Sequence, residues 1–169
     1  MRVLHVGCGN DPLPDYIPRS EELRVDADGN MRCDLVKDMR NLGAIGPFDV
    51  VFCRHALEHL CPEDVGTALQ EFHRVLADKG VAWIEVPNLE NIVVSDEVLY
   101  TVGDLEVTAL DMIYGHRRFE GANPWMAHRT GFTRQLLEKA FRYAGFAEVV
   151  TRDPGTYNLI GVAVKREAA

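Results

Sequence analysis

The sequence has no long apolar run, no excess of positive charge and no closely spaced cysteine pair. No stretch approaches the roughly 18 apolar residues of a membrane-spanning helix, and residues 1–9 reach glycine too early for a signal peptide. The formal net charge of -8 argues against a nucleic acid or an anionic membrane surface as the main partner, because neither would be attracted. We therefore expect a cytoplasmic protein that binds neither.

The cysteines do not indicate a disulfide framework. They are scattered and form no C-x-x-C pair: Cys8, Cys33, Cys53 and Cys61. A chain of 169 residues with ordinary globular composition does not need disulfides, so we expect all four to be reduced. The sequence also lacks repeats, low-complexity tracts and linkers. One domain over residues 1–169 is the simplest interpretation, and the oligomeric state is left open.

Short apolar runs that end in glycine, acid or proline predict a series of parallel strands. They lie at residues 2–7, 23–28, 48–53 and 80–87, with a shorter candidate at 32–36. Apolar residues at helical spacing predict helices between Pro62 and Gly80 and between Thr133 and Gly145. A D-P-G turn at 153–155 separates two further strands. The alternation predicts an α/β fold: a Rossmann-like, mostly parallel sheet with helices on both faces and a C-terminal antiparallel hairpin strand.

The connection over residues 88–131 is unusually long and rich in His, Arg and aromatic residues. Such connections are usually functional or disordered, and these large side chains would gain by packing. We interpret the segment as a candidate insertion that covers a substrate. Its candidate substrate-binding residues are Tyr114, Arg117, Trp125 and His128. The alternative is a solvated basic and aromatic segment packed on the sheet.

A glycine turn, V-G-C-G-N-D-P, follows the first predicted strand. Gly7 and Gly9 allow a tight turn and a close approach of the backbone to a ligand. Asp26 ends the second strand, at about the spacing where a carboxylate takes the hydroxyls of a ribose. A dinucleotide site would need a third glycine and a helix that receives phosphate, but Asp11 and nearby prolines occupy that place. The pattern favours a nucleoside without phosphates.

Several motifs in order carry a family resemblance: V-L-H-V-G-C-G, K-D-M-R-N-L, F-D-V-V-F-C-R-H-A-L-E-H-L, E-F-H-R-V-L-A-D-K-G-V-A-W-I-E-V-P-N and H-R-T-G-F-T-R-Q-L-L-E-K-A-F-R-Y-A-G-F. Together they resemble a class I S-adenosylmethionine-dependent methyltransferase, most closely the type 11 group. The resemblance is strongest over residues 3–88. It implies S-adenosylmethionine as the cofactor.

The resemblance also implies roles for residues after the first two strands. Gly7, Cys8 and Gly9 would line the methionine part of the cofactor. Asp26 would bind the ribose hydroxyls, and Ala27 would lie beside the adenine.

Further cofactor residues are implied after the later strands. Asp38 would accept a hydrogen bond from the adenine amino group, and the Met39 backbone would meet the ring. Cys53 and Arg54 would contact the amino-acid end of the cofactor through backbone atoms.

The stretch C-R-H-A-L-E-H-L-C contains H-x-x-E-H, a pattern also found in zinc proteases. His55 and His59 could share a helical face, but the strand before them and Pro62 after them leave about two turns at most. No third ligand follows at motif spacing, so we expect no metal. The position instead favours the rim of the cofactor crevice, where His55 faces the substrate. Glu58 and His59 either act there directly or fix the turn.

The sequence thus predicts methyl transfer from S-adenosylmethionine to an unidentified, small-molecule acceptor. If the acceptor must lose a proton, His55 and His116 are the candidate bases. The alternative is a methyltransferase-like domain that binds or interacts without catalysis, and the third reading is a zinc hydrolase.

Overall fold

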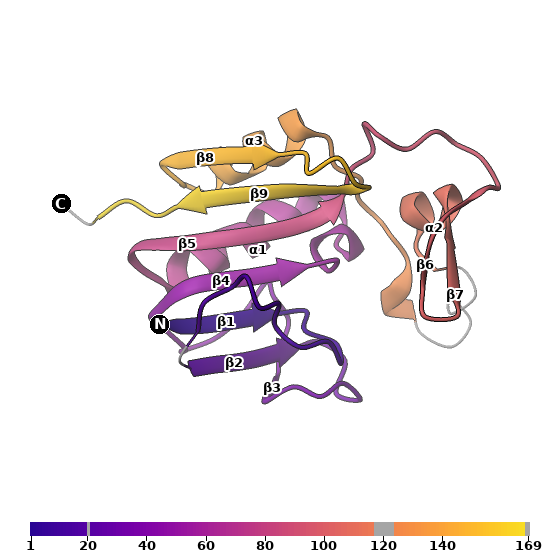
Figure 1. Ribbon diagram of the computed structural model, residues 1–169. Coiled ribbons are helices and arrows are strands. Elements are labelled where there is room, and N and C mark those ends of the chain that lie inside the picture. Colours follow the sequence, from indigo (N-terminus) through magenta and orange to yellow (C-terminus); the bar gives the residue numbers. More distant parts are fainter. Residues whose placement is uncertain (20, 117–123, 168–169) are drawn as a thin grey trace.

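The computed structural model describes residues 1–19, 21–116 and 124–167 (Figure 1). Its centre is a seven-stranded sheet in the order β3-β2-β1-β4-β5-β9-β8. The strands are β1 (Arg2–Val6), β2 (Glu21–Asp26), β3 (Leu35–Val36), β4 (Phe48–Arg54), β5 (Leu76–Pro87), β8 (Glu148–Arg152) and β9 (Asn158–Val164). The first five strands of this order, from β3 to β5, are parallel to one another. Strand β9 is antiparallel to both of its neighbours, β5 and β8. The predicted sheet and its C-terminal antiparallel hairpin are confirmed.

The strand order reverses between β1 and β4. The chain adds β2 and β3 on one side of β1, then returns to build β4 and β5 on the other side. Parallel sheets of this kind bind ligands outside the carboxyl ends of their strands, at this switch point. Gly7 follows the end of β1 and His55 follows the end of β4, so both lie at the switch point.

Both longer helices cover the same face of the sheet (Figure 1). Helix α1 (Pro62–Val75) starts with proline and two acids, which suit a helix N-terminus. Helix α3 (Arg134–Tyr143) is capped as predicted by Thr133, whose hydroxyl accepts a hydrogen bond from the Leu136 N–H. Their apolar stripes join one core cluster with alternate residues of the strands, including Leu4, Val51, Ile84, Leu69, Phe72, Leu137 and Phe141.

The opposite face differs from the expectation of helices on both faces. Residues 10–19 cover it as turns and irregular chain, with Leu13 and Ile17 packed against Val3 and Phe52. Prolines at positions 12, 14 and 18 explain this, because proline removes backbone donors and disfavours helix at the residue before it.

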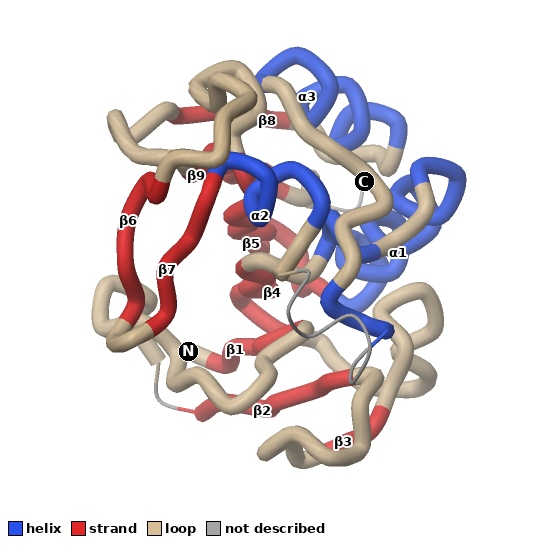
Figure 2. Tube along the Cα trace, turned by 90° about the vertical axis from the view of Figure 1, so that its right-hand side faces the viewer, coloured by secondary structure: helices blue, strands red, loops and turns tan. Residues whose placement is uncertain are grey.

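The insertion over residues 88–131 stands beyond the carboxyl ends of the parallel strands (Figures 1 and 2). Its described elements are β6 (Val98–Val102), β7 (Leu105–Thr108), α2 (Ala109–Tyr114) and the 3-10 helix η3 (Pro124–Met126). Backbone N–H groups of Arg129 and Thr130 bond the Glu58 carbonyl at 2.8 and 3.0 Å. The Thr130 hydroxyl donates to the Leu60 carbonyl at 2.6 Å. The insertion is therefore fastened to the rim of the sheet.

No helix among the described residues combines the length and the apolar character that crossing a membrane requires. The cytoplasmic location stays a prediction.

Candidate functional site

The glycine turn after β1 is held by backbone geometry. Gly7 adopts φ +62°, and a Cβ atom placed on it would lie 2.3 Å from the Cβ of Ala56. Gly9 adopts φ +50° but has open space around the same position. Only glycine takes these conformations without strain, and only at Gly7 is the side-chain space also filled. The turn therefore brings the β1 and β4 ends into direct contact and leaves open space beside Gly9.

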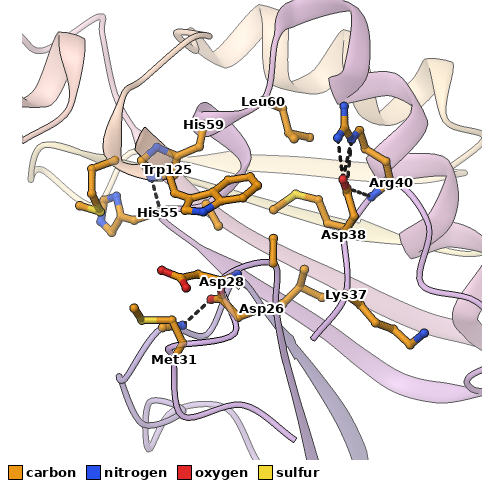
Figure 3. Close-up of a pocket in the computed structure, with 17 residues that line it drawn as sticks. Asp26, Asp28, Met31, Lys37, Asp38, Arg40, His55, His59, Leu60 and Trp125 are labelled. Carbon is orange, nitrogen blue, oxygen red and sulfur yellow. Dashed lines mark hydrogen bonds and ion pairs between the residues drawn. The ribbon is translucent and has the colours of Figure 1, made fainter. Parts of the chain in front are cut away.

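A first cavity, of ≈ 190 Å³, lies beside this turn (Figure 3). Residues after β1, β2, β3 and β4 all contribute to its wall. Six of the residues expected to hold a cofactor line it: Gly7, Gly9, Asp26, Ala27, Asp38 and Met39. Cys53 and Cys8 are buried and Arg54 lines a different cavity, so these three do not face it with side chains.

Asp26 is fixed by the backbone around it. One carboxylate oxygen accepts from the Gly9 N–H at 2.8 Å, and the other accepts from the Asp28 N–H at 2.9 Å. An ionised carboxylate has about four acceptor sites, so both oxygens keep capacity for further donors. Asp26 thus ties the glycine turn to β2 and presents acceptors to the cavity.

Asp38 is held from the other side by Arg40. The Arg40 guanidinium contacts both carboxylate oxygens, with the closest approach 2.6 Å, and also reaches Asp64 at 2.7 Å. These hydrogen bonds hold the pKa of Asp38 below its usual range. The carboxylate is therefore ionised and oriented at the cavity wall (Figure 3).

The H-x-x-E-H stretch does not form an α-helix. Strand β4 ends at Arg54, and His55 then takes the left-handed conformation with φ 49°. Its N–H bonds the Glu85 carbonyl at 2.9 Å, which fixes this unusual backbone. A single 3-10 turn, η1 (Leu57–His59), follows. The rigid helix that a zinc protease needs is absent from this described stretch.

Four ionisable side chains nevertheless gather there. Glu58 is buried, and one of its oxygens lies 3.3 Å from His55 Nδ1 and 3.9 Å from His128 Nε2. Burial alone would raise the pKa of Glu58, but the hydrogen bond from His55 and the charges of His55, His59 and His128 bring it below its usual value. Burial lowers the pKa of His128. Residue 128 comes from the insertion, so the cluster joins two distant parts of the chain.

A second, larger cavity of ≈ 740 Å³ lies under the insertion. Apolar and aromatic side chains of β6, β7 and α2 line one side, including Tyr100, Val107 and Met112. The wall also includes ionisable side chains from the sheet rim and the insertion, namely Asp11, Arg54, His55, His59, Asp111, His116 and His128. His55, His59 and Met126 line both cavities, so the two adjoin at this point.

The residues predicted to bind substrate are placed differently from one another. His128 and the candidate base His116 line the second cavity. Trp125 lines the first cavity, although its side chain is 52% exposed. Tyr114 is 55% exposed and lines neither cavity. Arg117 lies outside the described residues.

Comparisons with known proteins agree with this geometry. The family model described as a methyltransferase domain matches residues 4–84, from β1 into β5. A methyltransferase from Clostridium acetobutylicum, named as S-adenosylmethionine-dependent, superposes with a TM-score of 0.65 at 11% identity, over 98% of this chain and 84% of that one. The chain has the fold of a class I methyltransferase. The resemblance predicted from the sequence is confirmed.

A second neighbour of the methyltransferase fold carries ligands. It is the 1,6-didemethyltoxoflavin-N1-methyltransferase of Burkholderia thailandensis, bound to 1,6-didemethyltoxoflavin and S-adenosylhomocysteine. It is 20% identical, with a TM-score of 0.62, over 98% of this chain and 71% of that one. Other neighbours are longer: the chain covers 51% of a Nostoc punctiforme structure and 47% of the citrinin polyketide synthase CMeT domain structure. No curated protein matches the chain significantly.

Sequence reasoning missed several cavity residues of this methyltransferase fold. Asp28 and Met31 line the first cavity, just past the β2 end. The spacing of two between Asp26 and Asp28 was visible but ambiguous, because either could end the strand. Tyr100 and Asp111 of the second cavity carry no motif, and only the folding of the insertion brings them to the rim.

Proposed function

We propose that this chain binds S-adenosylmethionine in the first cavity and transfers its methyl group to a small-molecule acceptor in the second. The observation that carries the proposal is the meeting of the two cavities at His55, His59 and Met126. Methyl transfer needs donor and acceptor in line and close together, which two adjoining cavities provide. A volume of ≈ 740 Å³ lies within the usual range for small-molecule sites.

The residues of the first cavity fit a nucleoside. Asp26, Asp28 and Asp38 offer carboxylate acceptors. They outnumber the lysine and arginine of the wall, Lys37 and Arg40, and Arg40 is already paired with Asp38 and Asp64. These acceptors suit ribose hydroxyls and an adenine amino group, which donate, whereas the excess of carboxylates would repel a pyrophosphate. Among the described residues, the cavity has no helix N-terminus after the glycine turn to receive a phosphate.

Particular residues would hold each part of the cofactor. Asp26 would accept from the ribose hydroxyls and Asp38 from the adenine amino group, with Trp125 as an aromatic face beside them. The turn of Gly7 and Gly9 would border the methionine part. The cofactor supplies a methyl group that is already electrophilic, so the protein's part is to align the reactants, exclude water and take up any proton.

His55 is the residue best placed to take that proton. It lines both cavities, its side chain is 38% exposed, and its Nδ1 lies 3.3 Å from the buried Glu58 carboxylate. With the Nδ1 proton donated to Glu58, Nε2 is left as the basic nitrogen. Glu58 is then a positioning residue, which fixes the tautomer and ring orientation of His55. The same carboxylate would stabilise the imidazolium that forms when His55 takes the proton.

The second candidate function is a domain that binds S-adenosylmethionine without catalysis. The irregular chain over residues 10–19, where other open α/β folds place a helix, favours it. Against it stands the His55–Glu58 pair at the meeting of the cavities, which a binding module has no need of.

Calorimetry with S-adenosylmethionine tests the cofactor site. The wild-type chain is expected to bind with 1:1 stoichiometry, and Asp26→Asn to bind about 10- to 100-fold more weakly, because a charge-assisted hydrogen bond is lost. Asparagine keeps one acceptor, so it can bond only one of the two backbone N–H groups, that of Gly9 or that of Asp28, and its NH2 group faces the other. Asp78→Asn, an exposed acid at the other end of the sheet, is the matched control and should bind like wild type.

Absence of binding by the wild-type chain would remove the methyltransferase proposal. Transfer is then measured as S-adenosylhomocysteine formation with a panel of phenols, amines and nitrogen heterocycles. Binding with no product from any of them would favour the non-catalytic alternative.

A further inference from the structure

The Glu58 carboxylate is short of partners. Its side chain is 1% exposed, and its Oε2 atom is buried with no hydrogen-bond partner. Oε1 lies 3.3 Å from His55 Nδ1, its hydrogen-bond partner, and 3.9 Å from His128 Nε2. Buried carboxylates are normally satisfied by several donors or by a cation, since leaving them unpaired is costly. One oxygen of Glu58 is therefore left without the donor or cation that a buried carboxylate normally has.

His128 presents a free lone pair to this carboxylate. Its Nδ1 lies 3.0 Å from the Met112 carbonyl oxygen, so Nδ1 carries the proton and donates there. Nε2 is then unprotonated in the neutral ring and faces Glu58. A histidine that ligates a metal almost always has this arrangement, with its other nitrogen donating to a carbonyl or carboxylate.

His59 completes the cluster with a conflict of its own. Its Nδ1 lies 3.1 Å from the Ala127 carbonyl oxygen and its Nε2 lies 3.2 Å from the His55 carbonyl oxygen. A neutral imidazole has one N–H, so only one of these contacts is a hydrogen bond and the other sets two lone pairs against each other. Zn²⁺ on the unprotonated nitrogen would replace that contact, with the carbonyl moving aside, because a Zn–N bond of about 2.0–2.1 Å leaves no room for the ion between atoms 3.1–3.2 Å apart.

We propose that Glu58, His59 and His128 form a divalent-metal site suited to Zn²⁺, on the wall between the two cavities. One ligand atom from each lies within 4.8 Å of the other two. Two imidazoles and one carboxylate make the three-ligand set typical of zinc sites that keep a position open. His59 lines both cavities, so the open position is accessible from them.

This inference revises the expectation of no metal. The sequence showed no third ligand at motif spacing, and the structure supplies His128 from the insertion. The first histidine of H-x-x-E-H is not a ligand here, because His55 bonds the Glu58 carboxylate instead. Ligand atoms around tetrahedral zinc lie about 3.3 Å apart, so binding would draw the insertion toward η1. Zinc is therefore expected to stabilise the folded chain.

Zinc titration of the full chain after chelator treatment tests the site. Wild type is expected to bind one Zn²⁺, by competition with a fluorescent indicator, and to melt at a higher temperature with Zn²⁺ than without. Glu58→Gln and His128→Gln should each weaken binding by at least about tenfold and lose the thermal shift. His73→Gln, on α1 and packed against Phe146, is the matched control and should keep both.

Two results would overturn the proposal. One is a wild-type chain that takes up no Zn²⁺. The other is binding that persists in Glu58→Gln and His128→Gln but disappears in Cys61→Ser, which would place the metal on cysteine. Circular dichroism of each variant reports folding, and Co²⁺ in place of Zn²⁺ gives visible absorption that distinguishes histidine and carboxylate ligands from thiolate. S-adenosylmethionine binding is measured separately, so the cofactor proposal does not depend on the result.

Discussion

The two cavities that meet at His55 are built from different kinds of chain. The first is lined mostly by short turns that follow the parallel strands, and the sheet fixes where each turn emerges. The second is roofed by the insertion, whose β6, β7 and α2 touch the sheet rim at few points. A cofactor pocket can therefore stay the same while the acceptor pocket changes, because their walls belong to separate parts of the fold.

Replacing His55, where the two cavities meet, should have the largest effect on turnover. His55→Asn is the sharpest variant, because asparagine tolerates the left-handed backbone at φ 49° that most residues avoid. Loss of a general base lowers turnover by about 10²- to 10⁴-fold, while S-adenosylmethionine affinity should change little. The measurement is S-adenosylhomocysteine formation with whichever acceptor in the panel is turned over. Unchanged turnover would mean that another group takes the proton from the acceptor, and His116→Asn would be the next variant to measure.

The two glycines of the turn beside the first cavity should differ in how much they contribute to the free energy of unfolding. Gly7→Ala adds left-handed strain and places a Cβ atom 2.3 Å from that of Ala56, so it should destabilise folding by about 2–5 kcal/mol. Gly9→Ala has similar strain but open space, and should be destabilised by only about 1–2 kcal/mol. Urea unfolding of both variants measures the difference. Equal losses would show that the contact between the β1 and β4 ends relaxes without penalty.

The same contrast explains how much the sequence predicted. The first cavity was predictable because Gly7, Gly9 and Asp26 follow apolar runs, and parallel strands bring their carboxyl ends to one edge. Asp38 was expected there only through the family resemblance. Even there, the pairing of Asp38 with Arg40 was not foreseen, since side-chain partners depend on the folded turn.

The second cavity was not predictable in the same way. The composition of the insertion pointed to His116 and His128, but no periodicity showed that Trp125 would line the cofactor side and Tyr114 neither side. Its position depends on bonds from Arg129 and Thr130 to η1, which are tertiary contacts between segments far apart in sequence. The expectation of a helix on the second face of the sheet was wrong. Irregular chain over residues 10–19 covers that face instead, because its prolines disfavour a helix.

Replacing Trp125 should have the smallest effect, and it tests most specifically whether the walls of the two cavities act independently. It belongs to the insertion but lines the first cavity, as does Met126, so the insertion should contribute to cofactor binding through the aromatic face of Trp125. Base stacking on an aromatic side chain is worth about 1–3 kcal/mol, and half of the Trp125 surface stays in solvent. Trp125→Ala should therefore weaken S-adenosylmethionine binding toward the lower end of that range, about tenfold, by calorimetry. Tyr114→Ala is the matched control, because Tyr114 is similarly exposed and lines neither cavity. An equal loss of S-adenosylmethionine affinity in both variants would mean that the insertion acts through its overall packing rather than through Trp125. Changes in the insertion would then alter the cofactor cavity as well as the acceptor cavity.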